Sequence, residues 1–190
     1  MNNENHIFKE SFEIIITECR DALSRIDPDS VMQLIDAILS ADKVFFIGVG
    51  RVMLSLQSMV KRLAHLGINT YYVGQITEPA ITDKDLLIVG SGSGESLIPV
   101  VIAKKAKFLG AKIVHIGSNP NSSLKELTDI FVRIPVPTKM RLSDEINSEQ
   151  PMTSLFEQSL LLLGDIISRM IIIQKNIKMS ELWQHHANLE

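Results

Sequence analysis

The chain has 190 residues, long enough for one domain with a substantial core, and carries a formal net charge of −3 at pH 7. A charge so close to balance favours neither nucleic acid nor an acidic membrane surface as a partner. The single cysteine, Cys19, excludes an internal disulfide, and no apolar export signal is evident near the N-terminus, so we expect a cytoplasmic protein.

The N-terminal segment is predicted to be helical. Apolar residues at helical spacing indicate an amphipathic helix over 7–26. Asp27 and Pro28 then supply an N-cap and a first-turn proline for a second helix, which ends near Leu39.

The central segment alternates short apolar runs with helical periodicity. The predicted strands are 44–47, 70–73, 86–89, 113–116 and 130–134, and the later helices of this segment are 52–66, 96–109 and 122–127. Strands that are apolar without interruption are buried on both faces. We therefore predict an α/β fold of the flavodoxin type, with a five-stranded parallel sheet in the order 2-1-3-4-5 flanked by helices.

The C-terminal segment is predicted to begin with a polar loop over 135–150. Pro151 then opens a long final helix, and a short helix runs from Ser180 to His186. The most apolar stretch, 155–173, is interrupted by charged residues, which predicts a buried or interface helix and no membrane span.

We expect these elements to form a single domain over 1–190. It would consist of leading helices over 1–41, an α/β core over 42–134 and C-terminal helices over 150–190, because no linker or low-complexity segment separates them.

A run of glycine and serine directly follows the third predicted strand. It comprises Ser91, Gly92, Ser93, Gly94, Glu95 and Ser96. Glycines allow positive φ and close ligand approach, and serine hydroxyls donate to oxyanions without bulk. Pro99 fits only in a first helical turn, so the amides before it are free to bind an anion. The pattern favours a phosphate site, although an ordinary turn of an α/β protein would also contain these residue types.

A second glycine-bearing loop, with Gly48 and Gly50, follows the first strand. In a doubly wound sheet ligands bind where the winding direction reverses, and strands one and three flank that point, so the two loops should converge. A nicotinamide cofactor is not expected, because the third glycine of the dinucleotide fingerprint would fall at Met53 and no acidic residue ends the second strand.

Short motifs along the whole chain form a recognisable series. They are GVGR at 48–51, HLG at 65–67, PAI at 79–81, SGSGES at 91–96, AKKAK at 103–107, SNP at 118–120, PMTSLFE at 151–157 and HANLE at 186–190. In this order they resemble the 6-phospho-3-hexuloisomerase family within the sugar isomerase (SIS) fold.

The resemblance implies interconversion of 3-hexulose 6-phosphate and fructose 6-phosphate through a cis-enediolate. This reaction follows formaldehyde fixation in the ribulose monophosphate pathway. The resemblance also implies a homotetramer that uses neither a metal nor an organic cofactor. Its partners would be a phosphorylated sugar and further copies of itself, with Ser91, Ser93 and Ser96 as the phosphate ligands.

Three further residues receive candidate catalytic roles from the same match. Glu157 is the candidate general base, unless it is a solvated glutamate favoured by the helix N-terminus. His186 is a candidate proton shuttle, supplied by the same or a neighbouring subunit, or else an incidental histidine near the C-terminus. Arg51 is a candidate for stabilising the enediolate, or else a surface arginine at a helix start.

The other histidines are given no catalytic role. His65 falls in the last turn of its helix, where an imidazolium suits the helix dipole, and we expect it to be structural. His6, His115 and His185 show no metal-ligand spacing with Cys19, so we expect no metal site.

Three positions depart from the family pattern. The first loop of the family continues with serine and glycine, where this chain has Val52 and Met53. Valine cannot donate a hydrogen bond. Gln75 also replaces a commonly acidic residue after the second strand. The open alternatives are therefore an isomerase for a different sugar phosphate and a non-catalytic protein that binds sugar phosphates in regulation.

Overall fold

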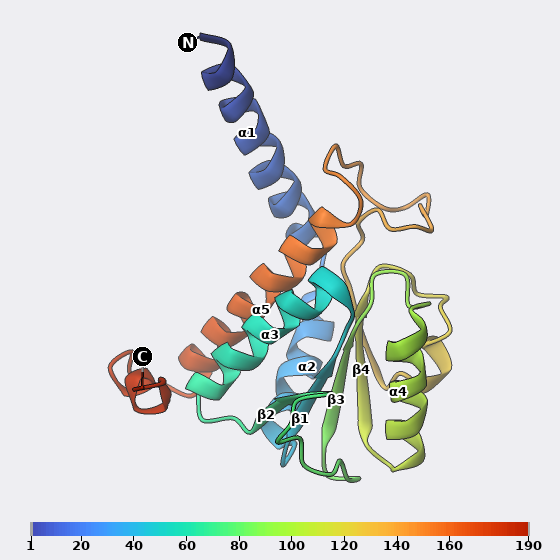
Figure 1. The fold of residues 1–190 in the computed structure, drawn as a ribbon, viewed down its shortest axis with the longest axis vertical. Helices are drawn as coiled ribbons and strands as arrows, with labels where there is room; N and C mark the ends of the chain where they lie inside the picture. Colours follow the sequence, from blue (N-terminus) through green and yellow to red (C-terminus); the bar gives the residue numbers. More distant parts are fainter. Residues whose placement is uncertain (1, 190) are drawn as a thin grey trace.

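The computed structural model describes residues 2–189; Met1 and Glu190, the ends of the predicted domain, lie outside the described residues. Five parallel strands form one sheet in the order β2-β1-β3-β4-β5, which confirms the predicted fold class (Figure 1). The strands are β1 (Val44–Ile47), β2 (Thr70–Tyr72), β3 (Leu86–Gly90), β4 (Lys112–Gly117) and β5 (Ile130–Arg133).

The helices cover both faces of this sheet. They are α1 (Asn2–Ser24), α2 (Pro28–Ser40), α3 (Gly50–His65), α4 (Leu97–Phe108) and α5 (Ser154–Gln174), with single 3-10 turns η1 (Lys125–Leu127) and η2 (Glu181–His185). No helix within residues 2–189 combines the length and the apolar character needed to cross a membrane.

The main differences from the predicted helices lie at the two ends of the chain and after β4. The first helix begins at Asn2 instead of residue 7, since helical geometry continues through polar residues that have no apolar face. The last begins at Ser154 instead of Pro151, because Met152 at φ 56° breaks the helical path. The predicted helix over 122–127 is only the turn η1, and the tail helix is the 3-10 turn η2.

Alternate residues of the strands enter two separate cores. On one face Phe46, Ile88 and Val114 pack with the apolar sides of α2, α3 and α5. On the other, Phe45 and Leu87 pack with α4. This alternation is the period of a β-strand, and it buries both faces of the sheet. The carboxyl ends of the strands, which these helices leave uncovered, form the open edge of the sheet.

The helix α1 extends away from the sheet, and one carboxylate near its C-terminal end secures the loop before α5 (Figure 1). Glu18 accepts hydrogen bonds from Ser148 Oγ at 2.7 Å, Glu149 N at 2.7 Å and Gln150 Nε2 at 2.9 Å. Burial would raise the pKa of Glu18, but these three donors together hold it below its ordinary value of 4.5. The charged form of Glu18 is thus preferred in the folded protein.

This anchor predicts a pH-dependent contribution to stability. A depressed pKa stabilises the fold above pH 4.5, and the contribution is lost as pH falls through the lower folded value. We expect Glu18→Gln to lower the free energy of unfolding by on the order of 1 kcal/mol at pH 7. The difference from wild type should shrink below pH 4, as measured by urea unfolding. Glu13→Gln, an exposed position on the same helix, is the control; an equal loss in both variants would contradict the anchor.

Candidate active site

The two glycine-bearing loops meet at the carboxyl ends of β1 and β3, which are paired neighbours in the sheet. A Cβ placed on Gly48 would lie 3.3 Å from the carbonyl oxygen of Gly90, the last residue of β3. Only glycine permits this approach without displacing the neighbouring backbone. The convergence expected from the strand order is therefore present.

Val52, the residue that departs from the family pattern, fills the junction of these loops. A Cβ on Gly90 would lie 3.1 Å from Val52 Cγ1, and a Cβ on Gly48 would lie 3.3 Å from the same atom. The valine side chain therefore packs against both strand ends, where a serine would place a hydroxyl.

The serine loop is a compact turn that closes on itself. The amide of Gly94, which has φ 68°, donates to Ser91 Oγ at 3.1 Å, and the amide of Glu95 donates to Ser93 Oγ at 3.2 Å. Ser96 is the N-cap of α4, yet its side chain makes no capping hydrogen bond. Turn capping, the alternative to phosphate binding, thus describes the hydrogen bonds of Ser91 and Ser93. It does not describe Ser96, whose hydroxyl does not cap the helix.

A buried histidine supports the serine loop from below. His115 lies on β4 and is 1% exposed, and its Nε2 lies 2.9 Å from the carbonyl oxygen of Ser91. Burial lowers the pKa of His115 to about 4, although the hydrogen bond to Ser91 works in the opposite direction. The ring is therefore neutral at pH 7, with its proton on Nε2, since a carbonyl oxygen can only accept.

The SNP motif after β4 secures the same loop from the side. The amides of Ser118 and Asn119 both donate to the carbonyl oxygen of Gly92, at 2.9 and 3.2 Å. The side-chain amide of Asn119 donates to the carbonyl oxygen of Ser93 at 3.2 Å. Sequence reasoning gave these residues no function; their position after a strand of the same sheet edge was the available signal.

The Glu95 carboxylate is held by Ser123, which follows β4 in the chain. Ser123 donates to its carboxylate through the backbone amide at 2.8 Å and the hydroxyl at 2.6 Å. These hydrogen bonds lower the pKa of Glu95 and leave it as an ionised structural carboxylate.

Glu157 is buried in the first turn of α5 and forms an ion pair with Arg51 of α3. Its Oε2 lies 2.9 Å from Arg51 Nε, and Thr153 Oγ1 donates to its Oε1 at 2.9 Å. The Glu157 side chain is 10% exposed and that of Arg51 is 62% exposed. Glu157 is therefore not a solvated glutamate: its carboxylate is buried and paired with an arginine whose side chain reaches the surface.

The serine loop packs against Phe156, the residue before Glu157. A Cβ on Gly92 would lie 3.4 Å from Cγ of Phe156 and 3.0 Å from the methyl group of Thr138. Arg51 also donates to Ser154 Oγ at 3.3 Å. The structure thus brings the serine loop, Arg51 and Glu157 together at one end of the sheet.

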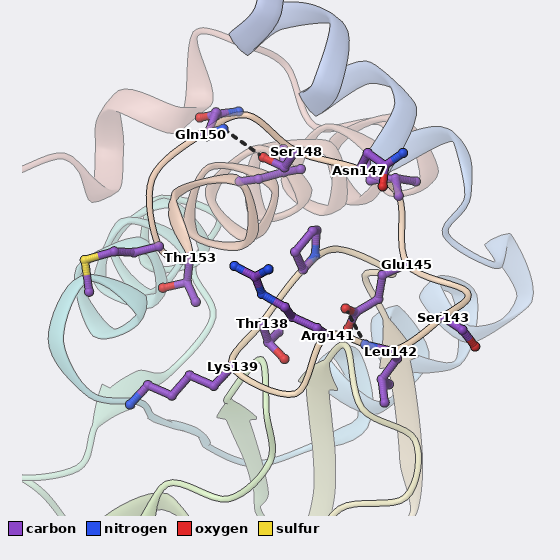
Figure 2. Close-up of a pocket in the computed structure, with 14 residues that line it drawn as sticks. Thr138, Lys139, Arg141, Leu142, Ser143, Glu145, Asn147, Ser148, Gln150 and Thr153 are labelled. Carbon is purple, nitrogen blue, oxygen red and sulfur yellow. Dashed lines mark hydrogen bonds between the residues drawn. The ribbon is translucent and has the colours of Figure 1, made fainter.

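A cavity of about 620 Å³ opens beside this contact, beneath the loop between β5 and α5 (Figure 2). It is lined by loop residues that include Thr138, Lys139, Arg141, Asn147 and Thr153. None of the residues predicted from the sequence lines it. It borders the site through Thr138, which contacts the serine loop, and Thr153, which contacts Glu157.

Two polar contacts hold the loop that covers the cavity. Arg133 of β5 binds Asp144 through both terminal nitrogens, at 2.6 and 2.8 Å, and this hydrogen bonding raises the pKa of Arg133. Ser118 Oγ donates to Glu145 Oε1 at 2.7 Å. The cavity wall is therefore attached to the ends of β4 and β5, beside the strand that the serine loop follows.

His186 lies elsewhere within one chain. Its ring stacks on His65, the last residue of α3, with centroids 5.0 Å apart. Arg51 is at the other end of α3, about 21 Å away at 1.5 Å per residue. Within one chain His186 is therefore remote from Glu157, and it lies against His65.

Among the described residues, no cluster of three or more histidine, cysteine, aspartate or glutamate side chains is arranged to hold a metal ion.

Comparison with known proteins identifies the family. The sequence model of the SIS domain matches residues 37–164. The 3-hexulose-6-phosphate isomerase of Bacillus subtilis (strain 168) is 37% identical over 176 residues, covering 93% of this chain and 95% of the relative. The chain belongs to the 6-phospho-3-hexuloisomerase family of SIS-domain proteins. This confirms the resemblance seen in the motifs, and with it the expectation of an isomerase.

Two further relatives match over nearly their whole length. The 3-hexulose-6-phosphate isomerase of Mycobacterium gastri is 36% identical, over 95% of this chain and 90% of the relative. A crystal structure of a Methanococcus jannaschii protein, from which a 3-hexulose-6-phosphate isomerase function was inferred, is 30% identical with a TM-score of 0.83. It covers 95% of this chain and 99% of that chain.

The serine loop predicts a specific sensitivity to added side chains. Gly94 and Gly74 both have positive φ, but a Cβ would lie 2.2 Å from Ser122 Oγ at Gly94 and meets nothing within 4 Å at Gly74. Alanine at either position costs about 1–2 kcal/mol of backbone strain. We expect Gly94→Ala to have the lower Tm and to bind fructose 6-phosphate at least about 10-fold more weakly than Gly74→Ala. Equal Tm and equal affinity would contradict this geometry.

Proposed function

We propose that the protein interconverts 3-hexulose 6-phosphate and fructose 6-phosphate. One observation carries the proposal: a buried carboxylate, Glu157, is paired with Arg51 beside a serine loop suited to phosphate. These residues lie in a chain 37% identical, over 93% of its length, to an enzyme named for this reaction.

The serine loop is proposed to bind the phosphate. Its residues precede α4, a helix of 12 residues whose N-terminal amides and dipole favour an anion. Ser96 is the best-placed hydroxyl because it is not used in capping α4. Ser91 and Ser93 shape the turn and add hydroxyl oxygens. Gly92 and Gly94 let the turn pack against Phe156 and Ser122, which holds its backbone in place for the phosphate.

Glu157 is proposed to move the proton. The carboxylate takes the proton from C2 of 3-hexulose 6-phosphate. The electron pair of that C–H bond forms the C2=C3 double bond of an enediolate, and the π electrons of the C3 carbonyl move onto its oxygen, O3. Return of the proton to C3, with transfer of the O2 proton to O3, gives the C2 ketone of fructose 6-phosphate. No atom is gained or lost, so the step requires only a positioned acid–base group.

Arg51 is proposed to stabilise the negative charge of the enediolate. Its guanidinium contacts Glu157 through Nε, and the Arg51 side chain as a whole is 62% exposed. The guanidinium N–H groups that do not bond Glu157 or Ser154 can therefore donate to an oxyanion bound beside Glu157. Gly48 and Gly50 open the loop from which this arginine begins.

We infer that His186, if it takes part, acts in the site of another subunit. Its ring stacks on His65, which lies about 21 Å from Arg51 along α3, as estimated from the helix rise. The expected homotetramer provides neighbouring subunits, and a cytoplasmic location in the ribulose monophosphate pathway fits the proposed substrate.

A second candidate is isomerisation of a different sugar phosphate by the same mechanism. Val52 Cγ1 packs against the strand ends at Gly48 and Gly90, at a position where the family has a hydroxyl. Loss of one hydrogen-bond donor changes which sugar oxygens are recognised.

The proposed reaction predicts turnover that depends on Glu157. Wild-type protein supplied with 3-hexulose 6-phosphate should produce fructose 6-phosphate, detected by a coupled dehydrogenase assay. Glu157→Gln should lower kcat by about 10²–10⁴-fold, with affinity for fructose 6-phosphate nearly unchanged.

A panel of pentose, hexose and heptulose phosphates separates the two candidates. Turnover of another sugar alone would favour the second candidate. Thermal stabilisation by sugar phosphates without any turnover would reject both in favour of a regulatory binding protein.

The phosphate assignment predicts a separate effect at Ser96. Ser96→Ala should raise KM about 5- to 10-fold and leave kcat within about 2-fold, because the phosphate is bound equally in ground and transition states. Ser24→Ala, which removes an exposed hydroxyl that bonds the Asp21 carbonyl oxygen within α1, is the control. An unchanged KM in Ser96→Ala would remove this residue from the phosphate site.

A further inference from the structure

We propose that Thr153 is a positioning residue that fixes the direction of the Glu157 carboxylate. This inference rests on the proposed function, since it concerns the group assigned there as the base. Its starting observation is the 2.9 Å hydrogen bond from Thr153 Oγ1 to Glu157 Oε1.

Thr153 occupies a helix position at which threonine normally has a different task. It is the N-cap of α5, and its carbonyl oxygen accepts the hydrogen bond from the Glu157 amide at 3.1 Å. An N-cap threonine usually accepts a hydrogen bond from a backbone amide of the first turn through its side-chain oxygen. Here the side chain makes no capping hydrogen bond, at φ −114° and ψ 21°. The stabilisation that a cap provides is given up for a bond to the carboxylate.

The two contacts of Glu157 hold the carboxylate from both sides. Arg51 Nε lies at Oε2 and Thr153 Oγ1 at Oε1, each at 2.9 Å. An ion pair alone permits the carboxylate to rotate about its last bond, whose torsional preference is broad. A second donor on the other oxygen removes that freedom, so the lone pairs point in one direction.

The place of Thr153 connects this hydrogen bond to the cavity. Thr153 lines the cavity wall, while Glu157 is 8% exposed and does not (Figure 2). A sugar bound between the serine loop and the cavity would meet the threonine beside the carboxylate. A hydroxyl that donates to Glu157 can also accept from a sugar hydroxyl, because it has two acceptor lone pairs.

The alternative is that this contact only stabilises the start of α5, as i, i+4 pairs do. The two explanations differ in what the loss of the hydroxyl changes. A helix-stabilising contact alters Tm and leaves kcat unchanged. A positioning contact lowers kcat, because misplacing a catalytic group by a fraction of an ångström is costly.

The experiment compares Thr153→Val, which keeps the shape of the side chain and removes the hydroxyl, with Thr153→Ser, which keeps the hydroxyl. We expect kcat to fall about 10-fold or more in Thr153→Val, with KM within about 2-fold of wild type, and to recover to within about 3-fold in Thr153→Ser. Thr128→Val removes a hydroxyl that bonds the Leu124 carbonyl oxygen outside the site, and is the matched control.

A second readout does not depend on the substrate. Crystal structures of Thr153→Val and Thr153→Ser should show the Glu157 carboxylate turned away from its wild-type direction in the first and retained in the second. An unchanged carboxylate, or a kcat unaffected while Tm falls, would overturn the inference. Absence of turnover in wild-type protein would instead reject the proposed reaction, and the carboxylate direction would still decide the role of Thr153.

Discussion

The ion pair between Glu157 and Arg51 is the contact on which the rest of the site depends. It joins α5 to α3 at the open edge of the sheet. A carboxylate at this depth is unfavourable without a partner, since an uncompensated buried charge costs several kcal/mol. Arg51 supplies the countercharge while most of its side chain stays exposed. The Glu157 carboxylate is therefore held out of bulk water beside a guanidinium that reaches the surface.

The serine loop is rigid because its carbonyl oxygens accept hydrogen bonds from neighbouring groups. His115 donates to the carbonyl oxygen of Ser91, Asn119 donates to that of Ser93, and two backbone amides donate to that of Gly92. The amides of Gly94 and Glu95 bond within the turn, whereas the Ser96 side chain makes no capping hydrogen bond at the N-terminus of α4. A helix N-terminus whose first amides are not capped favours an anion. Preorganisation of this kind limits the reorganisation needed when a phosphate binds.

The long helices separate the two histidines from the carboxylate. Because α3 runs from the open edge toward the opposite side of the domain, residues at its two ends cannot meet in one chain (Figure 1). His65 and His186 stack together at the far end. Any part that they play in the chemistry of the carboxylate requires a second subunit.

Sequence alone determined the sheet and the convergence of the two glycine-bearing loops, because both follow from local patterns. Continuous apolar strands, the proline in the first turn of α4 and the glycines after β1 and β3 sufficed for strand order and loop convergence. Tertiary structure alone decided the partners of Glu157, since Arg51 is 106 positions away in the chain. It also decided the role of Asn119, the pairing of Glu95 with Ser123 and the separation of His186 from Arg51. Such pairings depend on how helices pack, and no short-range pattern encodes the direction of a side chain across that contact.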